Sequence, residues 1–158
     1  MQLLTVILLW CFNGAAPGVD GTEVSGSETK WPVRKDCTLP PNLEGKHCGD
    51  PFYERRYYYN KTENKCVLFL PVKCGDRYKQ GNNFGKRKGC IRKCIRNSPC
   101  LKITWKNDTG PLTGYAYYPP LDICTSINYN DGASLWPSNN IFSTAEECQN
   151  NCAPADPI

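Results

Sequence analysis

Cysteine spacing constrains this chain more than any other feature. Ten of its eleven cysteines lie between positions 37 and 152. They form a first block at residues 37–94 and a second block at residues 100–152, and each block ends in two cysteines four residues apart. A domain this small buries too little apolar surface to be stable on that alone, so dense cysteines predict a disulfide-rich fold.

Metal binding is the alternative use of such cysteine pairs. His47 is the only histidine in the chain, however, and the secretion argued next favours oxidation to disulfides. We therefore expect no metal and no cofactor. With one histidine and with all its cysteines expected to be paired, the chain has few residues that could act as a catalytic nucleophile and its base. We therefore expect no enzyme activity.

The first residues are typical of a secretory leader. A run of about ten apolar residues starts at Leu3, which is too short to span a bilayer but suits the core of a signal peptide. Small residues at Ala16 and Gly18 favour cleavage after Gly18. We expect a signal peptide at 1–18, a secreted mature protein that has lost Cys11, and a polar, flexible N-terminal arm at 19–36.

Each block contains a tyrosine-rich segment followed by a cysteine. In the first block, tyrosines at 57–59 favour a strand, residues 60–64 have turn chemistry, and a second apolar strand follows from Cys66. A weaker copy occurs at residues 115–118 and Cys124. The recurrence predicts two tandem copies of one small disulfide-rich α+β domain, with a linker at 95–99 and a tail at 153–158.

The closing cysteines of each block predict a helix. A spacing of four residues puts Cys90 and Cys94 on one helical face, one turn apart. In the second block, Ser143 and Glu146 are typical of a capping box. In the first block, residues 85–89 hold three basic residues and two glycines, which oppose the helix dipole and weaken the helix. Basic residues at a position where they destabilise the helix indicate a binding role.

The first block resembles a Kunitz domain, the fold of pancreatic trypsin inhibitor. The matching features are Cys37 with Pro40 and Pro41, the run 56–60, Cys66 and Cys74, the run 82–84, and Cys90 with Cys94. The second block resembles a degraded copy, through residues 115–118, Cys124, residues 142–148 and Cys152. The resemblance implies a twisted β-hairpin and a C-terminal helix in each domain, and the pair is similar to tick salivary anticoagulants with two Kunitz domains.

The cysteine pairing follows only from the resemblance, since the sequence alone leaves many pairings open. The implied bonds are Cys37–Cys94, Cys48–Cys74, Cys66–Cys90, Cys100–Cys152 and Cys124–Cys148. The second block has no counterpart of Cys48–Cys74, so residues 102–114 are expected to be looser and to make a poor rigid inhibitor loop.

The family uses the residue after its second cysteine to fill the specificity pocket of a protease. For trypsin-like targets that residue is Lys or Arg, whereas here it is Gly49, so we expect weak or absent trypsin inhibition. A vestigial loop on a binding scaffold is the alternative to an altered protease contact. The candidate protease-contact loop consists of Gly45, Lys46, His47, Gly49, Asp50, Pro51, Phe52, Tyr53 and Glu54.

Charge separates the two blocks. Residues 37–96 hold fourteen Lys or Arg against five Asp or Glu, a net charge of +9, whereas residues 100–158 hold two against six, a net charge of −4. Surface drift can produce such a difference, but opposite fields also steer each block to a partner of opposite sign.

Two groups of side chains follow from this division. The basic patch, which could meet an acidic protein, heparin or an anionic lipid surface, consists of Lys86, Arg87, Lys88, Arg92, Lys93 and Arg96. The candidates for binding a basic protease exosite are Asp122, Tyr129, Asp131, Trp136, Glu146 and Glu147. Nucleic acid is not expected as a partner outside the cell.

The resemblance implies inhibition of the tissue factor–factor VIIa complex, with factor X or Xa bound as a scaffold through an exosite. The alternatives are a Kunitz-type toxin that blocks ion channels and an inhibitor of another serine protease. We expect a monomer. Asn60 and Asn107 begin glycosylation sequons, and Asn107 is favoured because Asn60 matches a family position inside the hairpin turn.

Overall fold

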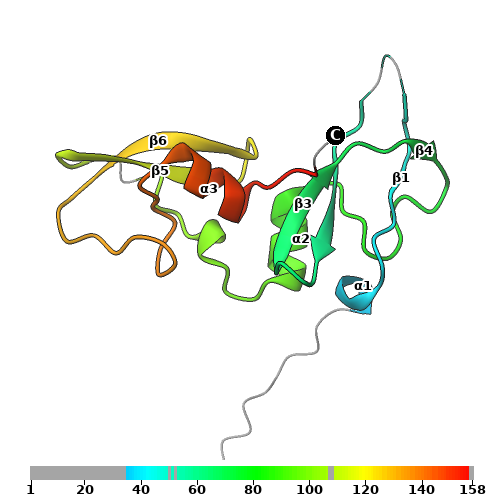
Figure 1. Ribbon diagram of the computed structural model, residues 1–158, viewed down its shortest axis with the longest axis horizontal. Coiled ribbons are helices and arrows are strands. Elements are labelled where there is room, and N and C mark those ends of the chain that lie inside the picture. The colour runs from blue at the N-terminus through cyan, green and yellow to red at the C-terminus, as the bar shows by residue number, and fades with distance from the viewer. Residues whose placement is uncertain (1–34, 50, 52, 107–108, 157–158) are drawn as a thin grey trace, which may run out of the picture. The chain divides into compact units, whose positions relative to one another are not determined.

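The computed structural model describes residues 35–49, 51, 53–106 and 109–156. The expected signal peptide, the arm up to residue 34, Asp50, Phe52 and Asn107 lie outside the described residues. Contacts between the described residues join both blocks into one unit. Its elements are short hairpins, short helices and five disulfides, which is the small disulfide-rich α+β class expected from the sequence (Figure 1).

An antiparallel hairpin forms the centre of the first block. Strands β2 (Arg56–Asn60) and β3 (Lys65–Phe69) pair over their full length, so residues 61–64 make the turn. Asn60 shapes this turn, because its side-chain oxygen accepts a hydrogen bond from the N–H group of Thr62 at 3.0 Å. Tyr57 packs into the core, 5% exposed, and its backbone bridges to Phe84.

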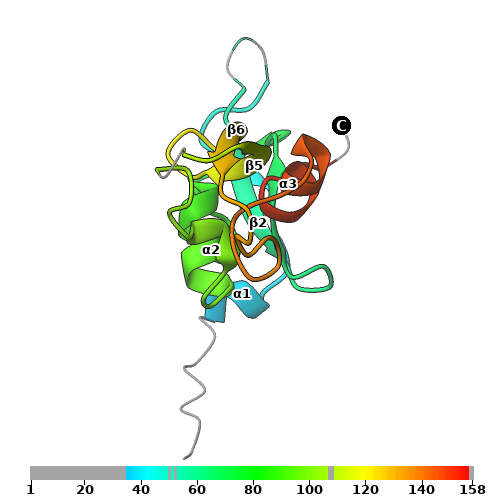
Figure 2. The same cartoon turned by 90° about the vertical axis from the view of Figure 1, so that its left-hand side faces the viewer.

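Two helices flank this hairpin. Helix α2 (Arg87–Cys94) is attached to β3 by the Cys66–Cys90 disulfide, and α1 (Lys35–Thr38) is attached to the C-terminal end of α2 by Cys37–Cys94. Both views show α1 beside α2 (Figure 1, Figure 2). A separate parallel pair, β1 (Glu44–Gly45) with β4 (Lys73–Cys74), lies next to the third disulfide of this block, Cys48–Cys74.

The second block repeats the hairpin and helix. Strands β5 (Leu112–Tyr118) and β6 (Ile123–Tyr129) form an antiparallel hairpin, preceded by a 3-10 turn, η1 (Pro99–Leu101), and followed by α3 (Ala145–Cys152). Cys124–Cys148 joins β6 to α3, and Cys100–Cys152 joins the two ends of the block. The five disulfides are the pairs that the family resemblance implies.

The two blocks also share a buried asparagine contact. The side chain of Asn82, 1% exposed, accepts from the N–H of Tyr59 at 2.8 Å and donates to its carbonyl oxygen at 2.9 Å. Asn140, 0% exposed, makes the same two bonds to Tyr117, both at 2.9 Å. In each case one amide satisfies both backbone groups of a strand residue that would otherwise be buried without a partner.

The helix α3 is capped one residue later than the sequence predicted. Its N-cap is Thr144, whose hydroxyl oxygen accepts from the N–H of Glu147 at 3.1 Å. The Glu147 carboxylate in turn accepts from the N–H of Ser143 at 3.3 Å. The predicted Ser143–Glu146 box is therefore wrong in register, because both Ser143 and Thr144 suit the cap and both Glu146 and Glu147 suit the first turn.

The C-terminal segment, expected as a tail, adds to the first hairpin. Leu68 in β3 donates its N–H to the carbonyl oxygen of Pro154 and accepts from the N–H of Asp156, both at 2.9 Å. Tyr58 donates its hydroxyl to the Asp156 carboxylate at 3.0 Å. The segment runs from α3 to the edge of β3 (Figure 1), so it ties the end of the second block to the first.

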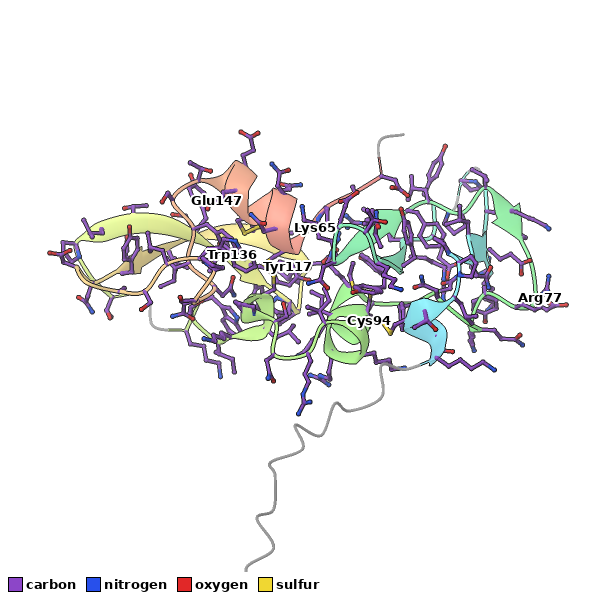
Figure 3. The ribbon with its side chains drawn as sticks, turned by 60° about the horizontal axis from the view of Figure 1, so that its bottom comes forward. Lys65, Arg77, Cys94, Tyr117, Trp136 and Glu147 are labelled. Atoms are coloured by element: carbon purple, nitrogen blue, oxygen red, sulfur yellow. A yellow bond between two sulfur atoms is a disulfide. The ribbon has the colours of Figure 1, made fainter. Side chains whose placement is uncertain are left out.

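A buried ion pair makes the second link between the blocks. Arg87 on α2, 2% exposed, donates from Nε to Oδ1 of Asp122, which lies between β5 and β6, at 2.7 Å. The same carboxylate accepts hydroxyl hydrogen bonds from Tyr57 at 2.8 Å and from Tyr117 at 2.7 Å. Figure 3 shows Tyr117 where the elements of the two halves meet. Three donors from both blocks therefore satisfy one carboxylate.

Arg87 extends this link to the backbone. Its Nη1 donates to the carbonyl oxygens of Cys66 in β3 and Pro154 in the C-terminal segment. Burial, followed by the charge of Asp122 and the hydrogen bond to it, raises the pKa of Tyr57 to about 12 and also raises the pKa of Tyr117. Both tyrosines therefore stay protonated donors throughout the physiological range.

Replacing Arg87 with Met removes the guanidinium but keeps most of the length of the side chain. The Asp122 carboxylate would lose its ion-pair partner, so we expect the free energy of unfolding to fall by about 3 kcal/mol. Lys88→Met is the matched control, because Lys88 is the next residue and is exposed, and it should change stability by less than about 0.5 kcal/mol. Guanidinium chloride unfolding with the disulfides intact measures both. Equal losses in the two variants would contradict the buried ion pair.

Candidate functional site

The candidate site is the loop at residues 45–54, which is fastened at both ends. At its start, Gly45 pairs with Cys74 across the parallel strands, and Cys48 is bonded to Cys74. Gly45 itself is buried: a Cβ atom there would lie 2.6 Å from the Pro71 ring and 2.9 Å from the Glu54 carboxylate. Gly45 thus allows close packing and is not a contact residue, which corrects the sequence prediction.

Glu54 holds the loop from its other end. Its carboxylate accepts from the N–H groups of Lys46 at 2.6 Å and His47 at 3.1 Å, and from Arg56 Nη1 at 2.8 Å. Burial acts to raise the pKa of Glu54, but these hydrogen bonds outweigh it and leave the pKa below its ordinary value. Glu54 was predicted to contact a protease; instead its carboxylate fixes the start and the end of the loop to each other.

Arg56 anchors this carboxylate to the body of the first block. Its side chain is 6% exposed and donates from Nε to the side-chain oxygen of Asn83 and from Nη2 to the carbonyl oxygen of Tyr78 at 2.7 Å. Asn83 in turn donates to the carbonyl oxygens of Asn42 and Glu44, at the approach to the loop. The two ends of the loop are therefore held by internal polar contacts as well as by one disulfide.

The outer part of the loop is open to solvent. Gly49 has φ of +84° and nothing would lie within 4 Å of a Cβ atom there, so the position after Cys48 presents backbone only. Tyr53 is 62% exposed. Val72, which lies outside the predicted contact loop, is 90% exposed two residues before Cys74. The exposed set is Lys46, His47, Gly49, Pro51, Tyr53, Val72 and Lys73.

The second block lacks this brace. Its corresponding described residues, 102–106 with 109 and 127–141, are not joined by a disulfide, and several of them border a hollow of about 560 Å³. Ile127 and Ile141 form the apolar floor, and Lys102 closes part of the rim by donating to the carbonyl oxygen of Ser138 at 2.6 Å. That residues 102–114 are looser and make a poor inhibitor loop stays a prediction.

Three of the predicted exosite residues are used inside the molecule. Asp122 forms the ion pair with Arg87, and Glu147 belongs to the cap of α3. Trp136 packs on the core, with its ring centroid 5.0 Å from that of Phe142. These three predictions are wrong, because pattern and charge do not distinguish an exposed side chain from one with an internal partner. Asp131 and Glu146 are exposed, and Tyr129 is half-buried.

One member of the predicted basic patch is also internal. Arg87 is buried against Asp122, so including it was wrong. The remaining members are exposed: Lys86, Lys88, Arg92, Lys93 and Arg96.

Asn60 is half-buried in the hairpin turn, as the family position implies. Within the residues that the structure describes, no group of His, Cys, Asp and Glu is arranged to hold a metal ion. None of the helices in that part of the chain is both long and apolar enough to cross a membrane.

Comparison with known proteins gives consistent results. The Kunitz/bovine pancreatic trypsin inhibitor domain matches residues 36–95. The Kunitz-type serine protease inhibitor bitisilin-3 from Bitis gabonica is 30% identical over 117 residues, which cover 73% of this chain and 70% of that protein. Haemaphysalin from Haemaphysalis longicornis is 27% identical over 75% of this chain and 73% of its own length. Ixolaris, solved with factor X, is 20% identical over 66% of this chain and 86% of its own, with a TM-score of 0.27.

Glu54→Gln should loosen the loop without unfolding the block. The amide keeps the size of the side chain but loses the charge that strengthens the bonds from Arg56, Lys46 and His47. We expect hydrogen exchange at the amides of Lys46 and His47 to become about tenfold faster, equivalent to roughly 1.4 kcal/mol. Glu63→Gln, in the exposed hairpin turn, is the control. Unchanged exchange at both amides would contradict the bracing role of Glu54.

Proposed function

The chain belongs to the Kunitz/bovine pancreatic trypsin inhibitor family, and we propose that it is a secreted inhibitor that binds a serine protease through its first block. Residues 37–94 form a Kunitz domain and residues 100–152 an atypical one. The shared pattern of hairpin, buried asparagine and helix disulfide supports this division.

The observation that carries the proposal is a braced loop without a basic residue at its specificity position. The Cys48–Cys74 disulfide and the Glu54 contacts hold residues 46–48 and Glu54 in place, so less conformational entropy is lost on binding. Gly49, however, offers no charge to the acidic base of a trypsin-like pocket. The loop therefore acts by surface contact, with Tyr53 in the loop and Val72 before β4 as the large exposed apolar groups.

The finer proposal is that the target is the tissue factor–factor VIIa complex, with factor X or Xa as scaffold. Its basis is the resemblance to two-domain tick salivary anticoagulants. The charge division supports it, because the net charge of −4 on residues 100–158 suits a basic exosite. Contact at an exosite would leave the active site of the scaffold open. Asp131 and Glu146 are the exposed carboxylates that would make this contact.

The links between the blocks determine how a contact made by the first block and a contact made by the second would combine in the overall affinity. A flexible linker would make the second contact an intramolecular event governed by effective concentration. With Arg87–Asp122 and the C-terminal segment holding the blocks together, both surfaces are instead presented in one fixed relation, and the gain in affinity comes from preorganisation.

The test uses the full mature chain. It should slow activation of factor X by tissue factor–factor VIIa, leave cleavage of a small substrate by factor Xa nearly unchanged, and inhibit trypsin weakly. Asp131→Lys with Glu146→Lys should slow association with active-site-blocked factor Xa about tenfold, mainly through the on-rate. Glu63→Lys with Asp76→Lys, an equal charge change in the first block, should have a much smaller effect.

Two results would contradict the proposal. Tight trypsin inhibition by the unaltered chain would mean that the loop acts as an ordinary substrate-like inhibitor. Block of a potassium current without binding to any coagulation protease would favour the ion-channel alternative. Equal effects of the two charge-reversed variants would contradict the exosite contact alone.

A further inference from the structure

The outward face of α2 is entirely basic in its charged residues. The inward face is formed by Arg87, Cys90, Ile91 and Cys94, all buried. The outward face presents Lys88, Arg92 and Lys93, and α2 contains no acidic residue. Arg87 is therefore a structural residue, whereas the other basic residues of α2 form an exposed cationic surface.

Residues outside α2 extend this surface. Lys86 precedes the helix and Arg96 follows it, and both are exposed. Lys35 is also exposed and lies two residues before Cys37. The disulfide between Cys37 and Cys94 holds the Cα atoms of these two cysteines 5.5 Å apart. Segments from two parts of the chain thus bring positive charge to one end of the helix. We call this surface the α2 face: Lys35, Lys86, Lys88, Arg92, Lys93 and Arg96.

These charges weaken the helix that carries them. Lys88 and Arg92 are four residues apart, and like charges at that spacing repel each other. The N-terminus of α2 has a basic residue at its cap and no side-chain hydrogen bond there. Among the described residues, no carboxylate forms a salt bridge with Lys86, Lys88 or Arg92. A bound polyanion would relieve this repulsion.

The centre of the α2 face is open to a close approach. Gly89 lies between Lys88 and Arg92 in the chain, and nothing lies within 4 Å of the position where its Cβ would be. The absence of a side chain there lets a ligand reach the helix backbone while the flanking basic side chains surround it. Lys88 and Arg92 are about 6 Å apart along the helix axis, so their cationic groups form a short linear row.

The composition of the α2 face selects one class of polyanion. Membrane-surface helices combine basic residues with apolar ones that enter the lipid. The large exposed apolar side chains in the described part of the chain all lie outside α2: Leu39, Leu43, Tyr53, Val72, Ile103, Leu112, Leu121 and Ile123. The row of cations on α2 itself carries no large exposed apolar side chain, which suits a hydrated linear chain with regularly spaced anions.

We propose that the α2 face binds a linear sulfated polysaccharide of the heparin and heparan sulfate type. The sulfates contact Lys88, Arg92 and Lys93, with Lys35, Lys86 and Arg96 at the ends of the row. Binding there leaves the 45–54 loop out of the contact, so it would hold the protein at sulfated cell surfaces independently of protease inhibition.

The test compares two triple variants of the full mature chain. Lys88→Gln, Arg92→Gln and Lys93→Gln remove three charges from the α2 face. Arg55→Gln, Lys61→Gln and Lys79→Gln remove three exposed charges elsewhere in the first block. Binding to immobilised heparin near physiological salt should weaken at least about tenfold in the first variant and less than about threefold in the second. Thermal unfolding checks that both variants remain folded.

Two further arms identify the ligand chemistry. Fully desulfated heparin should bind much more weakly than heparin, and vesicles containing phosphatidylserine should bind more weakly than heparin. Equal losses in the two triple variants would overturn the proposal, because they would reflect net charge alone. Vesicle binding as strong as heparin binding would overturn it in favour of a lipid surface. Neither result would bear on protease inhibition, which is measured separately.

Discussion

The ion pair between Arg87 and Asp122 determines how this molecule is organised. A buried arginine is costly unless it is paired and hydrogen-bonded, and here all three side-chain nitrogens donate, to the Asp122 carboxylate and to two carbonyl oxygens. Tyr57 in the first hairpin and Tyr117 in the second both donate to this carboxylate, so both hairpins are hydrogen-bonded to Asp122. The C-terminal segment accepts from Arg87 through Pro154 and pairs with β3, so the blocks are joined by two contacts that support each other.

The two blocks that this ion pair joins differ in the surfaces they present. The first block holds a loop braced by a disulfide and by Glu54, and it presents backbone and apolar side chains where a trypsin inhibitor presents a cation. The second block has no equivalent bond, and Asp131 and Glu146 are exposed carboxylates on it. Since the same ion pair removes Arg87 from the surface, the remaining basic residues of α2 form a separate face that can bind a polyanion while the loop stays accessible.

Much of the fold followed from the sequence, but the partners of individual charges did not. The tyrosine strands, the turns and the closing helices were accessible from residue pattern and spacing, and the disulfide pairs only from the family resemblance. The capping register of α3 was off by one because Ser143-Thr144 and Glu146-Glu147 each offer two equivalent choices. Arg87 and Asp122 are 35 residues apart, and Glu54 differs from other surface carboxylates only by its tertiary contacts. Local pattern therefore assigned all three to external binding surfaces.

Backbone ¹⁵N relaxation of the mature chain tests most directly whether the two blocks form one rigid body. If the ion pair and the C-terminal segment hold them together, amides in β2–β3 and in β5–β6 will fit one rotational diffusion tensor with one correlation time. Arg87→Met should then cause the two hairpins to tumble with separate, shorter correlation times. Separate correlation times already in the unaltered chain would contradict the account, because the blocks would then be tethered only by their linker.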